Sequence, residues 1–304
     1  MRISTNTFFD QGIGKITSLQ ADQSRLQGQI ATGKRFSNPS EDPVAAARAL
    51  EVSQQKEMNA TYANTRTVAK TNLETVEASL TNITNLLVAA QSTLVAAGNG
   101  AYSNLERGFV ATDLKNSLDA LVGLANGKDA YGTYLYAGYN SDVAPFTTTG
   151  AGATYNGDNN VQQLKVDAQR LMDVSVSGQE VFLANGTDVF STLNDIINLL
   201  NTPITDATTQ AAFSNGLATA MTNMQSSVDN IMNVRAAVGS KLNELDTLDI
   251  SGQDRDLQYA KSLSEIQDLD YAEALSEFAK NQTIMEAAQK SFSSTAQLSL
   301  FDFI

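Results

Sequence analysis

The sequence predicts a mainly α protein: a long helical coiled-coil rod with paired N- and C-terminal helices and a small inserted β domain. Three observations predict this class. Apolar residues recur with heptad spacing on either side of the middle of the chain, and the same spacing returns at both ends. Between about residues 131 and 190 the period changes to short alternating runs divided by Gly and Asn, which is typical of strands.

The first seam of apolar residues predicts a long helix that packs on a partner helix. Its spacing alternates strictly between three and four residues, and Gly98-Asn99-Gly100 predicts where the helix ends. The seam consists of Leu73, Val76, Leu80, Ile83, Leu87, Ala90, Leu94 and Ala97. We expect these residues to pack within the molecule.

A second seam follows the predicted strands and contains one charged position. Arg235 occupies a place where an apolar side chain is expected, and it either pairs with an acid on the facing helix or extends to solvent. The other seam residues are Leu217, Met221, Met224, Val228, Ile231, Val238, Leu242 and Leu245. Shorter helices are predicted from 110 to 125, ending before Asn126-Gly127, and from 193 to 200, ending before Pro203.

The predicted strands lie in the segments "YLYAGY", "ATYNGDNN", "VQQLKVD" and "MDVSVSGQEVF". Within them, Asn156-Gly157 is a residue pair typical of a tight hairpin turn. The acidic and amide side chains around this pair lack the spacing of a calcium loop, so the sequence favours a turn over a metal site.

The two ends of the chain carry weaker seams. Glutamine replaces an apolar residue at Gln23, Gln282 and Gln289, and polar seam residues weaken a coil while restricting its register and partners. Because short helices of this strength are marginal alone, we expect each end to need the other end or a neighbouring molecule. The remaining seam residues are Ile16, Leu19, Leu26 and Ile30 in one arm, and Leu275, Phe278, Met285, Phe292 and Ala296 in the other.

These patterns divide the chain into five predicted regions. They are an N-terminal coiled-coil arm (1–40), the first half of a helical rod (41–130), an inserted β domain (131–190), the second half of the rod (191–260) and a C-terminal coiled-coil arm (261–304).

Composition argues against several function classes. A net charge of −13 disfavours nucleic acid and anionic membranes as partners. The 304 residues include no cysteine and no histidine, so a thiol nucleophile, a thiolate metal site and the commonest general base are absent. We therefore expect neither an enzyme nor a cofactor, although catalysis by carboxylates alone stays open as an alternative. The first residues also lack the apolar core of a secretory signal, so we expect no signal-peptide export.

The segment "FSNPSEDPVAAARALE", residues 36–51, interrupts the helical pattern near the start of the chain. Asn38 and Asp42 each precede proline, which disfavours helical backbone, and Pro43 suits the first position of a helix that Asp42 would cap. The residues leave two interpretations open. The segment is either a plain corner between helices or a projecting elbow whose Arg35, Asn38, Glu41 and Asp42 contact a partner.

Both ends of the chain resemble the bacterial flagellin superfamily. The N-terminal resemblance lies in "LQGQIATGKRFSNPSEDPVAAARAL", where a helix ends in a Gly-Lys-Arg turn and a polar bend leads into an alanine-rich helix. The C-terminal resemblance lies in "SEIQDLDYAEALSEFAKNQTIMEAAQKSFSSTAQLSLFDFI". Within the superfamily, the proline after the acids and the aromatic terminus resemble members that join hook to filament more than flagellin.

The resemblance implies a structural subunit of the flagellum that is secreted unfolded by the flagellar type III apparatus, with an export chaperone on its C-terminal arm. Subunits would form a ring at the extracellular hook–filament junction, between a neighbouring hook-associated junction protein and the first layer of flagellin. It also implies that Arg35, Asn38, Asp42 and Pro43 make subunit contacts, because this stretch lies where coil meets rod in the family. Flagellin itself, or another secreted coiled-coil surface protein, is the alternative.

Overall fold

The computed structural model describes residues 5–100, 102–183 and 186–301, which form two compact units. Unit 1 comprises Met1–Asn59 and Asp254–Ile304, and unit 2 comprises Ala60–Gln253. Two helices contribute to both units: α2 (Pro43–Ala97) and α6 (Ala207–Gln267). Each unit is therefore made of segments from both halves of the chain.

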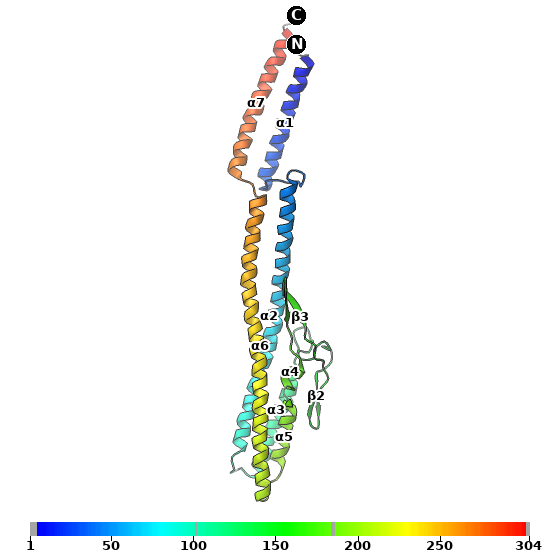
Figure 1. Cartoon of the computed structure of the whole chain (residues 1–304), viewed down its shortest axis with the longest axis vertical. Coiled ribbons are helices and arrows are strands. Elements are labelled where there is room, and N and C mark those ends of the chain that lie inside the picture. The colour runs from blue at the N-terminus through cyan, green and yellow to red at the C-terminus, as the bar shows by residue number, and fades with distance from the viewer. Residues whose placement is uncertain (1–4, 101, 184–185, 302–304) are drawn as a thin grey trace. The chain divides into compact units, whose positions relative to one another are not determined.

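Unit 2 is a bundle in which α2 and α6 run beside α3 (Asn104–Ala125) and α5 (Val189–Asn201) (Figure 1). The start of α3 has a complete capping box. The Ser103 hydroxyl accepts a hydrogen bond from the Glu106 backbone N–H, and the Glu106 carboxylate accepts one from the Ser103 N–H at 2.7 Å. The bond from Ser103 lowers the pKa of Glu106. The helix ends before Asn126-Gly127, as predicted.

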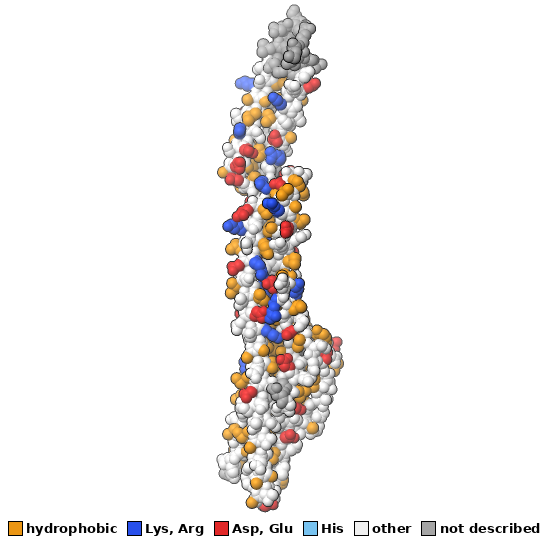
Figure 2. Space-filling view, viewed as in Figure 1, with side chains coloured by type: hydrophobic (Ala, Val, Ile, Leu, Met, Phe, Trp, Pro, Cys, Tyr) orange, Lys and Arg blue, Asp and Glu red, His pale blue; other side chains and the backbone are white. Residues whose placement is uncertain are grey.

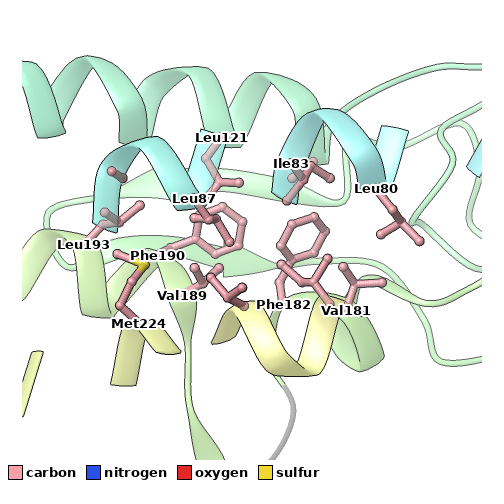
Figure 3. Packing of buried hydrophobic residues seen from close by; sticks show 14 of the residues in the cluster. Leu80, Ile83, Leu87, Leu121, Val181, Phe182, Val189, Phe190, Leu193 and Met224 are labelled. Carbon is pink, nitrogen blue, oxygen red and sulfur yellow. The ribbon is translucent and has the colours of Figure 1, made fainter. Parts of the chain in front are cut away.

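The predicted seams form the core of unit 2, and both predictions are confirmed. Every residue of the first seam is at most 2% exposed. In the second seam, Met221 and Leu242 are half-buried and the other apolar members are buried. Side chains from α2, α3, α5 and α6 interdigitate around Phe182 and Phe190 (Figure 3). A strict heptad spacing therefore located this core from the sequence.

Arg235, the charged residue of the second seam, pairs with an acid on the facing helix. Its guanidinium donates to Oε1 of Glu77 from Nη2 at 2.7 Å and from Nε at 3.0 Å. Both side chains are 29% exposed. Of the two outcomes left open by the sequence, pairing is the one observed, and the pair sets the register of α6 on α2.

The inserted strands form two antiparallel hairpins. β1 (Phe146–Thr149) pairs with β2 (Gly152–Tyr155), and β3 (Gln163–Asp167) pairs with β4 (Arg170–Asp173). A short helix, α4 (Gly178–Phe182), follows. Buried residues of the hairpins, including Phe146, Val166 and Met172, join the apolar cluster of the helices. The hairpins are thus anchored in the core of unit 2.

The prediction of a hairpin turn at Asn156-Gly157 is wrong. The two hairpins turn between β1 and β2 and between β3 and β4, and Asn156-Gly157 follows β2. The Asn156 backbone N–H donates to the carbonyl of Pro145 at 2.7 Å, and its side-chain amide donates to Thr147 Oγ1 at 2.8 Å. Asn156 therefore extends the first hairpin instead of turning the chain.

Unit 1 contains the two terminal helices, α1 (Thr5–Thr32) and α7 (Tyr271–Phe301), which lie side by side (Figure 1). The rings of Phe9 and Phe292 meet edge to face with centroids 5.4 Å apart. A Cβ on Gly12 would lie 2.8 Å from the Phe292 ring, so glycine permits this close approach. The predicted pairing of the terminal helices is confirmed, as is the mainly α fold class.

Three residues of the predicted seam of α7 do not take part in its contact with α1, and their contact with a neighbouring molecule stays a prediction. Leu275, Gln282 and Gln289 are exposed, while Phe278, Met285 and Phe292 are half-buried as expected of seam residues. The inward positions between them are taken by Ala274, which is 4% exposed, and by the half-buried Asn281 and Ala288. The inward stripe of α7 thus consists of Ala274, Phe278, Asn281, Met285, Ala288 and Phe292, and the exposed residues 275, 282 and 289 lie next to it.

The seam of α1 is as predicted but only partly covered. Leu26 is 2% exposed, whereas Ile16, Leu19, Gln23 and Ile30 are half-buried. The structure does not test the residue boundaries of the five predicted regions, which stay a prediction.

By length and composition alone, α2 would also be apolar enough to cross a membrane. Its seam from Leu73 to Ala97 is buried against the other elements of unit 2, which accounts for the apolar composition without a lipid environment.

Candidate functional site

The predicted elbow is a corner, residues 33–43, that joins α1 to α2 within unit 1. α1 ends at Thr32, and Gly33 follows in the left-handed region with φ of +69°. The corner is also joined to the break between α6 and α7. The Arg35 N–H donates to the Gln267 carbonyl at 2.7 Å, and the Leu269 N–H donates to the Gly33 carbonyl at 2.9 Å. These two bonds fasten the N-terminal and C-terminal arms to each other.

The predicted polar residues of the elbow come together in one network. Arg35 Nη2 lies 3.1 Å from Asp42 Oδ2, and Glu41 accepts hydrogen bonds at 3.1 Å from the Ser37 N–H and from the Asn38 side chain. Asp42 caps α2 by accepting from the Ala45 N–H at 2.9 Å. The capping role predicted for Asp42 is confirmed, and so is Pro43 as the first residue of the helix.

The network is open to solvent. The side chains of Arg35 and Asp42 are 53% and 40% exposed, so their ion pair contributes at most about 1 kcal/mol to stability. Charged groups held in fixed positions on an exposed corner are nevertheless available to a partner. The structure places all five predicted elbow residues there, and whether they contact another subunit is untested.

Beside the network lies an apolar groove of about 580 Å³ that the sequence reasoning missed. Its apolar lining comes from the corner and the first turns of α2: Phe36, Pro39, Pro43, Ala46, Ala47, Ala49 and Leu50. Leu50 and the nearby Val44 are more than 60% exposed, and hydrophobic side chains are visible on this stretch in Figure 2. The spacing 36, 39, 43, 46, 50 was a signal that could have indicated a continuous apolar stripe.

Unit 1 has almost no core of its own. Among its described residues, the buried apolar side chains are Leu26, Ala45, Ala49 and Ala274, and three of these are alanines. Large apolar side chains of the same unit are exposed: Ile13, Val44, Leu50, Met58, Leu257, Tyr271, Leu275 and Ile284. In unit 2, by contrast, one continuous apolar cluster extends from Ala69 to Leu245. Isolated helices with so little burial are marginal, and exposed apolar side chains of this kind are typical of surfaces that contact another molecule.

Across the part of the chain that the structure describes, no three of the residue types His, Cys, Asp and Glu are grouped so that they could hold a metal ion. The corner itself offers exposed apolar side chains beside a fixed set of charges, which is the chemistry of a contact surface.

Comparison with known proteins agrees with this description. Residues 3–141 match the model of the bacterial flagellin N-terminal helical region. The chain is 35% identical over 316 aligned residues to flagellar hook-associated protein 3 of Salmonella typhimurium, and the alignment covers 99% of each protein. It belongs to the flagellar hook-associated protein 3 family.

Further relatives support this assignment. The hook-associated protein 3 of Escherichia coli is 34% identical, again over 99% of each chain. Among solved structures, flagellar hook-associated protein 3 of Legionella pneumophila aligns with a TM-score of 0.67 at 19% identity, covering 71% of this chain and 98% of that one. FlgL of Xanthomonas campestris aligns with a TM-score of 0.62 at 19% identity, covering 72% and 99%. At these identities, the two structures bear on the fold alone.

Membership in the hook-associated protein 3 family confirms the resemblance drawn from the chain ends and favours a junction protein over flagellin. The relatives are structural proteins of the flagellum.

Proposed function

We propose that this protein forms the ring between hook and filament on which flagellin assembles. The single observation that carries the proposal is the contrast between a unit 2 with a complete core and a unit 1 whose apolar side chains are largely uncovered. In such a chain, neighbouring molecules in the assembly would cover the exposed apolar side chains of unit 1. The partners would be other copies of itself, the neighbouring hook-associated junction protein on one side and flagellin on the other.

Energetics support coupling between assembly and ordering. Covering an exposed Leu or Ile contributes roughly 1.5–3 kcal/mol, whereas fixing the backbone of one residue costs about 1–2 kcal/mol. α1 and α7 alone bury too few side chains to offset that cost over their length. If neighbouring subunits covered Ile13, Leu275 and Ile284, the added apolar burial would offset the cost of ordering the two helices.

The contacts would involve both predicted sets of residues. The corner offers the charges of Arg35, Glu41 and Asp42 next to its apolar groove. On α7, the exposed positions 275, 282 and 289 form a stripe with seven-residue spacing beside the seam that faces α1. A residue excluded from the intramolecular seam is free for an intermolecular one, so Leu275, Gln282 and Gln289 remain candidates for subunit contacts.

The same property fits secretion before assembly. Arms that do not fold alone stay extended enough to pass a narrow export channel, and a dedicated chaperone would cover the C-terminal arm until then. We infer export by the flagellar type III apparatus to an extracellular position and a purely structural role without catalysis.

The proposal predicts the phenotype of a strain that lacks this protein. Hooks should be present by electron microscopy, filaments should be absent, and flagellin should accumulate as monomers in the medium. Filaments on intact hooks would contradict the junction role. If the protein instead forms a secreted oligomer that is independent of hooks and filaments, it is a separate coiled-coil surface protein. Complementation with the wild-type chain is the control.

The corner can be tested in the complemented strain with the double variant Asp42→Ala, Pro43→Ala. Loss of the cap costs the start of α2 about 1 kcal/mol, which leaves the fold intact, but it removes the partner of Arg35 and one wall of the groove. We expect filament attachment to be impaired while the secreted amount of the protein stays at the wild-type level.

A matched control is Asp22→Ala on α1, whose carboxylate lies 3.6 Å from Arg25 and is 52% exposed, away from the corner. It should leave attachment unchanged. A fall in the secreted amount of the corner variant would show instead that the corner serves export or folding.

A further inference from the structure

A second, polar pocket lies at the end of unit 2 where α2 gives way to α3. Its volume is about 520 Å³. Three segments line it: the connection after α2 with the first turn of α3, the loop before α6, and the first turns of α6. The lining residues that matter below are Ser103, Asn104, Arg107, Ile204, Gln210 and Phe213.

Arg107 is the charged residue of this pocket, and its side chain is held in place by neutral groups. It is only 5% exposed. Its Nη2 donates to Asn104 Oδ1, and its guanidinium carbon lies 5.1 Å from the centroid of the Phe213 ring. Asn104 is fixed in turn, because its Oδ1 also accepts from the Ile204 N–H at 2.9 Å. The guanidinium is therefore held between α3 and α6, and Asn104 links it to the loop before α6.

The positive charge of Arg107 is not paired with a carboxylate in the described part of the chain. Its Nε is buried without a hydrogen-bond partner. Among the residues that the structure describes, no carboxylate forms an ion pair with it. Two acids in the segments that line the pocket already have partners: Glu106 accepts from the Ser103 N–H, and Asp206 accepts from the Thr209 N–H at 2.8 Å. Burying a guanidinium without an anion costs several kcal/mol. The chain has a net charge of −13, so a second copy would offer many carboxylates that could pair with Arg107.

The start of α3 lines the same pocket, and the partial positive charge of this helix end is already met by the Glu106 carboxylate, which accepts from the Ser103 N–H at 2.7 Å. α3 has 22 residues, and its N-terminus, with Ser103 and Asn104, lines the pocket. A guanidinium presents paired N–H donors to carboxylate or phosphate oxygens. Arg107 therefore brings a positive charge without a paired carboxylate to a polar cavity that is large enough for a small anion.

We propose that this pocket binds an oxyanion group through Arg107. The group is either a free oxyanion such as phosphate or the side-chain carboxylate of a second copy of this chain. In both cases it would complete the hydrogen bonding of the guanidinium, clamp the loop before α6 to α3, and stabilise this end of unit 2. The inference is independent of the junction role, because it concerns a site within unit 2.

The first experiment uses inorganic phosphate as the probe. Thermal unfolding of the full-length chain is followed by circular dichroism while phosphate replaces chloride at constant ionic strength. We expect a saturable rise of Tm in the wild type and at least a tenfold weaker response in Arg107→Met, which keeps the length and apolar packing of the side chain. Arg107→Lys, which keeps the charge but loses the paired donors, should respond weakly and covers the case in which the Met variant fails to fold.

The control variant is Arg170→Gln. Arg170 is an exposed arginine of unit 2 that is already paired with Glu244 at 2.8 Å, so its loss should leave the phosphate response intact. An equal, non-saturating response of the wild type and all variants would overturn a phosphate site, since it would report a general salt effect.

Sedimentation separates the two sources of the anion. If the carboxylate comes from a second copy, the wild type but not Arg107→Met should associate at high protein concentration in chloride, and phosphate should reverse the association. If the ligand is a free oxyanion, phosphate binds without any change in sedimentation. The proposal is refuted if phosphate gives no saturable rise of Tm and the wild type shows no association that depends on Arg107.

Discussion

Replacing Phe190 with alanine is expected to destabilise unit 2 by about 3–5 kcal/mol, the range for removing a buried aromatic side chain. Phe190 is fully buried, and its ring centroid lies 4.8 Å from that of Phe146 and 5.3 Å from that of Phe182. Its backbone is also packed closely, because a Cβ on Gly152 would lie 2.8 Å from the Phe190 carbonyl carbon. Urea unfolding followed by circular dichroism measures the loss.

The matched control for this substitution is Phe109→Ala. Phe109 lies on α3 in the same unit but is 64% exposed, so its removal should change the free energy of unfolding by no more than about 0.5 kcal/mol. Equal losses in the two variants would contradict the assignment of the core. A small loss of stability in both Phe190→Ala and Phe109→Ala would contradict it as well.

Replacing Gly33 with valine should separate the arms while leaving unit 2 intact. Gly33 has φ of +69°, a conformation that costs a non-glycine residue about 1–3 kcal/mol, and a Cβ there would lie 2.8 Å from the Tyr271 hydroxyl. The residue also supplies the carbonyl that holds the Leu269 N–H. In a unit with so few buried side chains, this loss is a large fraction of its stability. We expect filament attachment to be lost.

Limited proteolysis with mass measurement detects the separation in the purified chain. Residues 5–59 and 254–301 should be cut faster in Gly33→Val than in the wild type, while the urea midpoint of unit 2 stays the same. Gly28→Ala is the control, since nothing lies within 4 Å of a Cβ at this position in α1, and alanine there should be neutral or slightly stabilising. Slow cleavage of the arms in Gly33→Val would show that the corner does not hold them together.

The long seams could be predicted from the sequence because a strict heptad spacing admits only one buried stripe. Leu80, Ile83 and Leu87 illustrate this: each is fully buried where the spacing placed it. The sequence showed that Arg235 lies in the seam but could not show that it pairs with Glu77. That pairing depends on the register between two helices that are far apart in the sequence.

The errors have physical causes too. In α7, apolar character favoured Leu275 over Ala274, but Ala274 is the residue buried in unit 1 and Leu275 is exposed, because size and polarity alone do not fix which face of a helix packs inward. Asn156-Gly157 suits a turn wherever it occurs, and nothing local states which strands pair. The groove at the corner was missed because Phe36 and Pro39 precede the helix that carries Leu50, so the stripe crosses a break in secondary structure.

The sparse burial of unit 1 has a genetic consequence if neighbouring molecules supply the missing surface. A substitution at Leu50 or Leu275 would barely change the solitary molecule, since both side chains are already in water. Its harm would fall on whichever intact copies stand next to the altered one. Defective alleles at such positions should therefore be dominant over the normal allele, whereas alleles that unfold the bundle should be recessive, because their products never reach the assembly.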